Sequence, residues 1–482
     1  MIGSVRRMFR ASTLVALGAG FFFGSAMGLS AQEAAGVVKS PNFTGLVKTK
    51  GTKDWTLVKG GSTIQPGDTV LAGSRMVVAA PDGDVTLDFR GDVAGISPLS
   101  IHETVVEFNT PGKGIDMEIT PSRGRLDLTN TKKSGSSLVK VNFFGESALV
   151  RLKTPGTKFT VDMLGRWAAG EKFSRTYEKD QTPTISVVLV VINGEIEISH
   201  AEVTTRLGAP PGPAQIHFNN HTFGYIHPEN LDKLPDWISG NFNTNSPLIA
   251  ARKASAEKLF ALVNEKEAFG PALDVLAGSA SETDRRIAIF LMGATDNLDK
   301  LWSTMLTLKT PDVLDDSVIA LRHLIGREPG QDVKLWNYLV NTRKYTEGQA
   351  DQTLDLLHSP SKAELNSPEY FEHLVLLLGA KRDLPRILAN WHLVRLMPEG
   401  KNIGYNPFGS PESRKVAAAK WTNLIAKDKS NTLKPKGKAP SAAGESEKGS
   451  NKKKLPFLEL LRHGEGRRTR HRQEHRRRRA AV

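Results

Sequence analysis

Short runs in the first half of the chain alternate between apolar and polar residues. Clear examples are residues 85–89, 115–119 and 138–141. Alternation of period two places one face of a strand on a core and the other in water. Residues 185–192 are almost continuously apolar and β-branched, which predicts a central strand covered on both faces. We therefore predict an all-β domain over residues 37–230, folded as a β-sandwich or as a rolled β-barrel.

Two dipeptides of Asp or Asn followed by Gly lie between these strand-like runs. They are Asp82-Gly83 and Asn193-Gly194. Such pairs favour the left-handed backbone of tight hairpins, so we expect a hairpin turn at each.

A longer series of glycine motifs runs through the β region in a fixed order. Its members are Gly45-Leu46-Val47, Trp55, Gly60-Gly61, Gly67-Asp68-Thr69-Val70, Gly73-Ser74, Asp82-Gly83, Pro98-Leu99-Ser100, Gly124-Arg125-Leu126, residues 153–161 and Asn193-Gly194-Glu195-Ile196. This order and spacing resemble the FecR-like domain family over roughly a third of the chain. The resemblance implies an extracytoplasmic β domain that senses or binds partner proteins, and it implies no catalytic residue.

The chain departs from the family pattern in two places. Its Thr-Pro and Gly-Thr-x-Phe elements are fused, as residues 154–159. The sigma-regulating members of the family carry a cytoplasmic helical segment before their membrane helix, whereas only the first ten residues precede the apolar leader here. We therefore do not expect contact with a cytoplasmic sigma factor.

The hydrophobic period changes in the second half of the chain. Residues 245–428 show apolar residues at helical spacing, and the motif at 290–294 recurs at 376–380. A helix, a glycine break and a helix at such intervals predict stacked α-helical hairpins that loosely resemble HEAT-like repeats. A compact helical bundle is the alternative. We expect four tryptophans of this region to be core wedges between hairpins, namely Trp302, Trp336, Trp391 and Trp421.

Residues 1–31 have the pattern of a secretory signal peptide. Arg6, Arg7 and Arg10 precede an uncharged apolar stretch that ends in small residues before Gln32. The alternative is an uncleaved anchor, since about 20 apolar residues can span a bilayer. We therefore expect a periplasmic, secreted or cell-envelope protein of a bacterium. If the leader is kept, we expect an inner-membrane anchor with the chain facing the periplasm.

The formal net charge of +14 is concentrated at the two ends of the chain. The leader carries +3, residues 32–433 hold 46 basic and 46 acidic residues, and residues 434–482 carry +11. High charge with low hydrophobicity predicts a disordered basic tail over residues 429–482. Such a tail suits an anionic polymer or anionic lipid; the alternatives are a plain solvated tail and a shifted reading frame. Because the body is neutral, we do not expect nucleic acid as a partner.

The strongest metal-ligand candidates are His217, His221 and His227. The pair Asn219-Asn220 predicts a two-residue hairpin turn between the runs that hold the first two histidines. That turn places His217 and His221 on opposite faces, so the three side chains cannot chelate one ion. We predict no metal ligand.

Two pairs of carboxylates invite a catalytic interpretation. Asp315-Asp316 precedes an apolar helical run, where acids favour the helix terminus, and Glu195 and Glu197 alternate on the solvent face of a strand. Both pairs are better explained by structure. The chain has no cysteine, phosphate-binding loop, nucleophile elbow, dinucleotide fingerprint or calcium loop. We therefore predict no catalytic residue, no cofactor and no enzyme activity.

Together these patterns predict an exported, non-enzymatic protein that acts in extracytoplasmic sensing, regulation or protein–protein interaction at the bacterial cell envelope. We expect a protein partner there, and contact with the membrane only through an uncleaved leader. One alternative is an envelope-architecture module that binds anionic glycan or wall polymer. The other is a hydrolase of unknown type.

Overall fold

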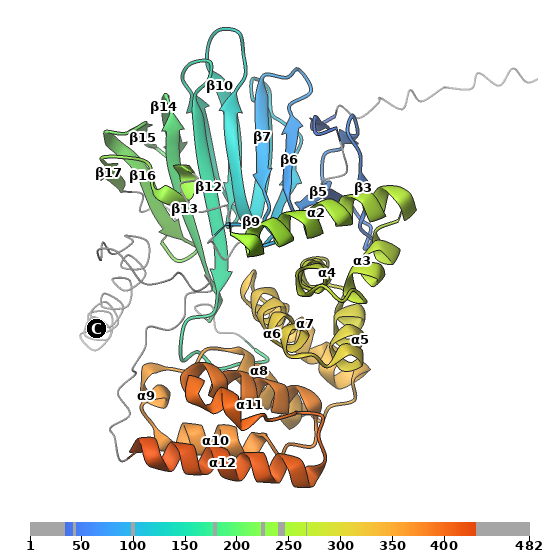
Figure 1. Cartoon of the computed structure of the whole chain (residues 1–482). Helices are drawn as coiled ribbons and strands as arrows, with labels where there is room; N and C mark the ends of the chain where they lie inside the picture. The colour runs from blue at the N-terminus through green and yellow to red at the C-terminus, as the bar shows by residue number, and fades with distance from the viewer. Residues whose placement is uncertain are drawn as a thin grey trace, which may run out of the picture.

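The computed structural model describes residues 34–41, 45–97, 102–176, 181–222, 227–239, 246–266 and 268–429. Strands occupy the chain as far as Leu231, and helices follow from Asp236 (Figure 1). The predicted order, a β region followed by a helical region, is confirmed. We call residues 34–231 the β half and residues 236–429 the helical half. The predicted leader and the predicted tail beyond residue 429 lie outside the described residues.

The β half consists of two sheets. In pairing order, sheet A contains β4 (Thr63–Ile64), β1 (Gly36–Val38), β6 (Arg75–Ala79), β7 (Val85–Arg90), β9 (Met117–Asn130), β12 (Lys158–Arg166), β13 (Thr184–Asn193), β16 (Gly212–Asn219) and β17 (Pro228–Leu231). Sheet B contains β3 (Thr56–Val58), β2 (Gly45–Lys48), β5 (Thr69–Ala72), β8 (Thr104–Phe108), β9 again, β10 (Ser137–Phe143), β11 (Glu146–Leu152), β14 (Glu195–His200) and β15 (Val203–Gly208).

The long strand β9 belongs to both sheets. Its first part pairs with β8 and runs parallel to β10, and its second part pairs with β7 and β12. The strand changes sheet at Gly124, whose φ is +88° and where a Cβ atom would lie 2.5 Å from the Cα of Thr104. Only glycine tolerates both the positive φ and this close approach. One strand therefore joins the two layers.

The two layers enclose a common apolar core, as expected for a sandwich. Inward-facing residues such as Phe89 and Leu126 from sheet A meet Val106 and Phe108 from sheet B. The expectation for residues 185–192 is also met, because β13 has buried residues on both of its faces, including Leu189 and its neighbour Val190.

The two predicted hairpin turns have different outcomes. Asp82-Gly83 does join β6 to its antiparallel neighbour β7, and Gly83 has φ +82°. Asn193-Gly194 joins β13 of sheet A to β14 of sheet B, which are not paired with each other. The expectation of a hairpin there is wrong. The left-handed glycine was correctly expected, but it carries the chain across the sandwich.

The helices of the second half follow one another in chain order. They are α1 (Asp236–Ser239), α2 (Pro247–Lys266), α3 (Phe269–Ala277), α4 (Glu282–Ala294), α5 (Leu298–Leu308), α6 (Pro311–Gly326), α7 (Gln331–Asn337), η1 (Tyr338–Thr342), α8 (Glu347–Leu357), α9 (Lys362–Leu365), α10 (Pro368–Leu377), α11 (Asp383–Leu396), η2 (Pro398–Ile403) and α12 (Pro411–Lys429). The repeated sequence motif falls at corresponding places, since residues 290–294 end α4 and residues 376–380 span the end of α10. Among the helices that the structure describes, none is long and apolar enough to cross a membrane.

The four tryptophans divide into two groups. Trp302 and Trp421 are buried in the helical core, as predicted. Trp336 and Trp391 are only half-buried, and each has an arginine over its ring: Arg175 at 4.6 Å and Arg395 at 3.8 Å respectively. The second pair therefore packs apolar on one side and against guanidinium on the other.

The two halves meet tightly where β12 approaches α6. Gly165 and Gly326 are in backbone contact, and a Cβ atom on Gly165 would lie 2.9 Å from the Cα of Arg327. Close by, the indole of Trp167 donates a hydrogen bond to the carbonyl of Ile325 at 3.0 Å. We call this region the closed joint.

Two histidines extend the closed joint. His102 and His323 lie with their Nε2 atoms 3.1 Å apart, and the ring of His102 stacks on Phe290 with centroids 4.0 Å apart. The apolar core of the helical half continues into the β half through residues such as Leu71 and Trp167. The two halves thus share one core cluster.

Candidate functional site: a cleft at the junction of the two halves

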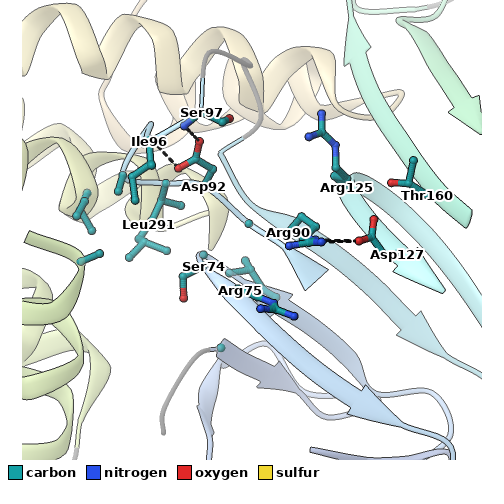
Figure 2. Close-up of a pocket in the computed structure, with 18 of the residues that line it drawn as sticks. Ser74, Arg75, Arg90, Asp92, Ile96, Ser97, Arg125, Asp127, Thr160 and Leu291 are labelled. Atoms are coloured by element: carbon teal, nitrogen blue, oxygen red, sulfur yellow. Dashed lines mark hydrogen bonds and ion pairs between the residues drawn. The ribbon is translucent and has the colours of Figure 1, made fainter. Parts of the chain in front are cut away.

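A cleft of about 660 Å³ lies between the outer face of sheet A and helices α1 to α4. Both halves line it: strands on one side, helices on the other, and the loop of residues 91–97 at one end (Figure 2). The volume falls within the range of roughly 300–1,000 Å³ that is usual for small-molecule sites.

The register of sheet A places two carboxylates directly opposite each other beside the cleft. Asp88 of β7 is the cross-strand partner of Asp127 on β9, and Asp127 has Thr160 of β12 on its other side. Both aspartates are buried. Like charges in directly opposite positions destabilise a sheet, so this arrangement requires nearby cations.

Three basic side chains supply that charge. Arg75 lies 2.9 Å from Asp88, while Arg90 and Lys158 lie 2.7 Å and 2.9 Å from Asp127. Burial opposes ionisation of Asp127, but the two cations outweigh burial and hold its pKa below the usual range. The hydrogen bond from Arg75 to Asp88 likewise raises the pKa of Arg75. The sheet side of the cleft is therefore charged at neutral pH.

Arg125 connects the sheet to helix α1. Its guanidinium lies 2.8 Å from Asp162, stacks 4.3 Å from the ring centre of Trp237 and donates to the Trp237 carbonyl at 3.3 Å. Burial raises the pKa of Asp162 even with this partner. Two buried polar atoms of the lining, the Nε of Arg125 and the Oγ of Ser74, have no hydrogen-bond partner among the described residues.

The loop at the end of the cleft is held from both sides. Asp92 accepts hydrogen bonds from the backbone amides of Ile96 and Ser97, each at 2.7 Å. Arg252 of α2 donates to the carbonyl of Gly95 at 2.5 Å. Burial raises the pKa of Asp92. The loop is thereby tied to the helical half and shapes the end of the cavity.

The wall opposite the sheet is apolar. It is formed by Leu259 and Phe260 of α2, Phe269 of α3, and Ile287 and Leu291 of α4. In Figure 2, Leu291 lies on the far side of the cavity from the polar side chains of the sheet. The cleft therefore has one charged side and one apolar side.

The predicted metal-ligand candidates do not come together. His217 lies on β16 opposite Val188, and burial lowers its pKa. The three-residue group His217, His221 and His227 does not form a metal-binding cluster among the described residues. That none of them binds a metal stays a prediction.

The reason given for that prediction is wrong, however. Asn219-Asn220 is not a two-residue hairpin, since β16 pairs with β17, which begins only at Pro228. The side chain of Asn220 instead accepts a hydrogen bond from the backbone amide of Ile185 at 2.9 Å and so holds the start of β13.

One acidic group does satisfy the geometry of a metal site. It comprises Asp82, Asp84 and Asp116, whose carboxylates lie within 4.8 Å of one another. Lys132 lies between them, 3.2 Å from Asp84 and 2.8 Å from Asp116. The ammonium group of a lysine thus lies where a metal ion would have to bind in this cluster.

Both carboxylate pairs contain residues that form ion pairs. Asp316 pairs with Arg286, and Asp315 lies 2.6 Å from Arg395. The pair lies in the second turn of α6 rather than ahead of the helix, because Pro311 begins it. Glu197 lies on the outer face of β14, with Lys153 at 2.9 Å.

Sequence reasoning missed the residues of the cleft. The polar positions of 85–89 were expected to face water, yet Asp88 is only 7% exposed. The available signal was a charge at alternate positions in three strands that turn out to be neighbours: Asp88 and Arg90, Arg125 and Asp127, Lys158 and Asp162. Solvent-facing strands carry such charges too. Only the pairing of the strands therefore distinguishes charges that line a cleft from charges that face water.

Comparison with known proteins gives little. No family model and no curated protein matches the chain. Two crystal structures of a candidate anti-sigma factor from Parabacteroides distasonis ATCC 8503 are partly similar. One is 21% identical with a TM-score of 0.21, over 34% of this chain and 61% of that chain. The other is 20% identical with a TM-score of 0.21, over 38% and 70%.

Proposed function

We propose that this protein is an exported, non-enzymatic sensor of the bacterial cell envelope, in which a ligand in the cleft changes how the chain contacts a partner protein. The observation that carries the proposal is the lining of the cleft, to which both halves contribute. An occupant would contact sheet A and helices α1 to α4 together. Its binding energy would therefore depend on how the halves are arranged, which is the requirement for coupling a ligand to a partner.

The chemistry of the lining favours binding over catalysis. Its two described carboxylates, Asp92 and Asp127, are engaged in hydrogen bonds or ion pairs. Histidine, the commonest general base, is missing from the described lining residues. The resemblance to FecR-like domains and the signal-peptide pattern support an extracytoplasmic place for such a sensor.

The test fills the cleft without changing charge. Ala256 of α2 lines the cavity, and Ala261 on the same helix is exposed. Cells that make Ala256→Trp, Ala261→Trp or the unchanged chain are treated with a crosslinker and fractionated. The mature N-terminus of the protein, the cell fraction that contains it and the proteins crosslinked to it are then determined. We expect a start at Gln32, an envelope fraction and a defined partner whose yield changes several-fold with Ala256→Trp only.

Three outcomes would contradict the proposal. The first is a chain found in the cytoplasm with its leader intact. The second is a chain that crosslinks to no partner in the envelope. The third is a partner whose yield responds equally to Ala256→Trp and Ala261→Trp, because the cleft would then play no part.

A further inference from the structure

The two sides of the cleft differ in polarity, and this difference restricts what can occupy it. This inference rests on the proposed function, because it names the class of ligand for the same site. On the sheet side, Arg90, Arg125 and Asp127 line the cavity, while Leu291 lies across from them (Figure 2). A wholly apolar occupant would leave charges without water, and a wholly polar one would leave the helix wall unfilled.

The charged side has an excess of positive charge. Four cations (Arg75, Arg90, Arg125 and Lys158) are paired with three carboxylates (Asp88, Asp127 and Asp162), which leaves a net charge of +1. Asp127 is shared between two of the cations. An anion can therefore approach this surface without meeting a carboxylate that has no partner.

A second group of cations lies behind the loop at the end of the cleft. Guanidinium atoms of Arg252 and Arg286 come within 3.5 Å of the position that a Cβ atom on Gly95 would take. Their acidic neighbours include Asp92, Asp316 and Glu282, and burial raises the pKa of Asp92 and raises that of Asp316 to about 7. With a pKa of about 7, Asp316 is only partly ionised at neutral pH.

Unpartnered donors point the same way. The Nε of Arg125 and the Oγ of Ser74 are buried in the lining without an acceptor among the described residues. A guanidinium Nε–H can only donate, and leaving a buried donor unpaired is unfavourable. Oxygen atoms of a ligand, or water held beside one, would supply the acceptors.

We infer that the cleft binds an amphipathic anion: one negatively charged head group lies near Arg90, Lys158 and Arg125, and an apolar body lies against α2, α3 and α4. The head group is identified by charge alone, so carboxylate and phosphate are both acceptable. The body is identified by the apolar wall, which a small hydrophilic anion would not contact.

The direct test is calorimetric titration of the purified full chain with four probes below their micelle concentrations. Decanoate supplies both parts, decanol only the apolar body, acetate only the charge, and decyltrimethylammonium the opposite charge. We expect decanoate to bind at least about tenfold more tightly than decanol, which corresponds to about 1.4 kcal/mol. Acetate and decyltrimethylammonium should give no saturable heat. Decyl phosphate in place of decanoate then distinguishes the two head groups.

Substitutions locate the site. Lys158→Gln removes the excess charge while Arg90 remains on Asp127, so it should weaken decanoate about fivefold to tenfold and leave decanol unchanged. Lys153→Gln removes a comparable pair, 2.9 Å from Glu197 on sheet B, and should change neither. Phe260→Ala should weaken both ligands. If Lys158→Gln does not fold, Arg75→Gln serves instead, because the Arg75 side chain is 68% exposed.

Decanol binding as tightly as decanoate, tighter binding of decyltrimethylammonium, or no saturable binding of decanoate would overturn the inference. The two proposals fail separately. If decanoate does not bind but Ala256→Trp still alters partner yield, the ligand class is wrong and the sensor stands. If decanoate binds through Lys158 but partner yield ignores the cleft, the ligand class stands and the sensor is wrong.

Discussion

The two halves of this protein meet in two ways, at the closed joint and at the cleft. At the closed joint, two glycines let β12 and α6 approach to backbone contact, and Trp167 bonds to the end of the helix. At the cleft, the outer face of sheet A and the first helices are separated by a cavity of about 660 Å³. The same pair of layers is thus locked at one place and separated at another. Added volume should be costly at the first and tolerated at the second.

The largest expected effect is at the closed joint. Gly165→Ala puts a methyl group 2.9 Å from the Cα of Arg327, so β12 and α6 must separate. We expect the free energy of unfolding to fall by roughly 2–3 kcal/mol, as is usual for overpacking. Urea denaturation measures it. Gly348→Ala, at an exposed position near the start of α8, has no neighbour within 4 Å and is the control, with no loss expected. Equal stability of the two variants would contradict a closed joint.

A smaller loss is expected from Trp167→Phe. The carbonyl of Ile325 lies in the last turn of α6, where it lacks an intrahelical partner, and the indole satisfies it. Losing that bond should cost about 1–2 kcal/mol beyond the loss of volume. Trp421→Phe removes a buried indole whose Nε1 has no acceptor among the described residues, so it measures the volume effect alone. If both variants lose the same stability in urea, the hydrogen bond contributes nothing.

The histidine pair should make the closed joint sensitive to acid. Burial lowers the pKa of His102 and of His323, and Arg286 opposes a positive charge on both rings. Glu103 favours a positive charge on His323, but the pKa of His323 is still lowered. The unfolded chain therefore binds protons first as the pH falls below about 6.5. The free energy of unfolding should then drop by about 1.4 kcal/mol per pH unit for each histidine.

His102→Gln removes one of these two groups. Its unfolding free energy, measured at pH 7 and at pH 5, should fall less than that of the unchanged chain over the same interval. Part of the fall remains, because burial lowers the pKa of His392 in the helical half to about 4. If the unfolding free energy of the variant fell between pH 7 and pH 5 as much as that of the unchanged chain, His102 would take up no proton on unfolding.

The smallest effect is expected in the cleft. Ala256→Trp adds far more volume than Gly165→Ala, but the larger side chain enters a cavity that is already present. Its free energy of unfolding should change by less than about 1 kcal/mol, close to that of Ala261→Trp on the exposed side of α2. A loss as large as that of Gly165→Ala would mean that the cleft closes in solution.

Features of the fold that depend on neighbouring residues could be predicted from the sequence, whereas those that depend on residues far apart in the chain could not. Alternation over residues 85–89 located β7, and the apolar run 185–192 located β13 with both faces covered, because each pattern is local. The pattern did not show that Asn193-Gly194 crosses between sheets, since a left-handed glycine serves a hairpin or a crossing equally well. Nor did it show that Asp88 is covered, because a charged alternate residue usually faces water.

The sequence by itself determined the order of the two halves, the kind of element in each, and the lack of a recognised catalytic motif. Periodicity and turn residues act over a few positions, so they can be read along the chain. Only the tertiary structure decided that Asp88, Asp127 and Lys158 lie together and that helices α1 to α4 cover them. Those residues are up to 70 positions apart, and strand pairing brings them into one site, which no local pattern records.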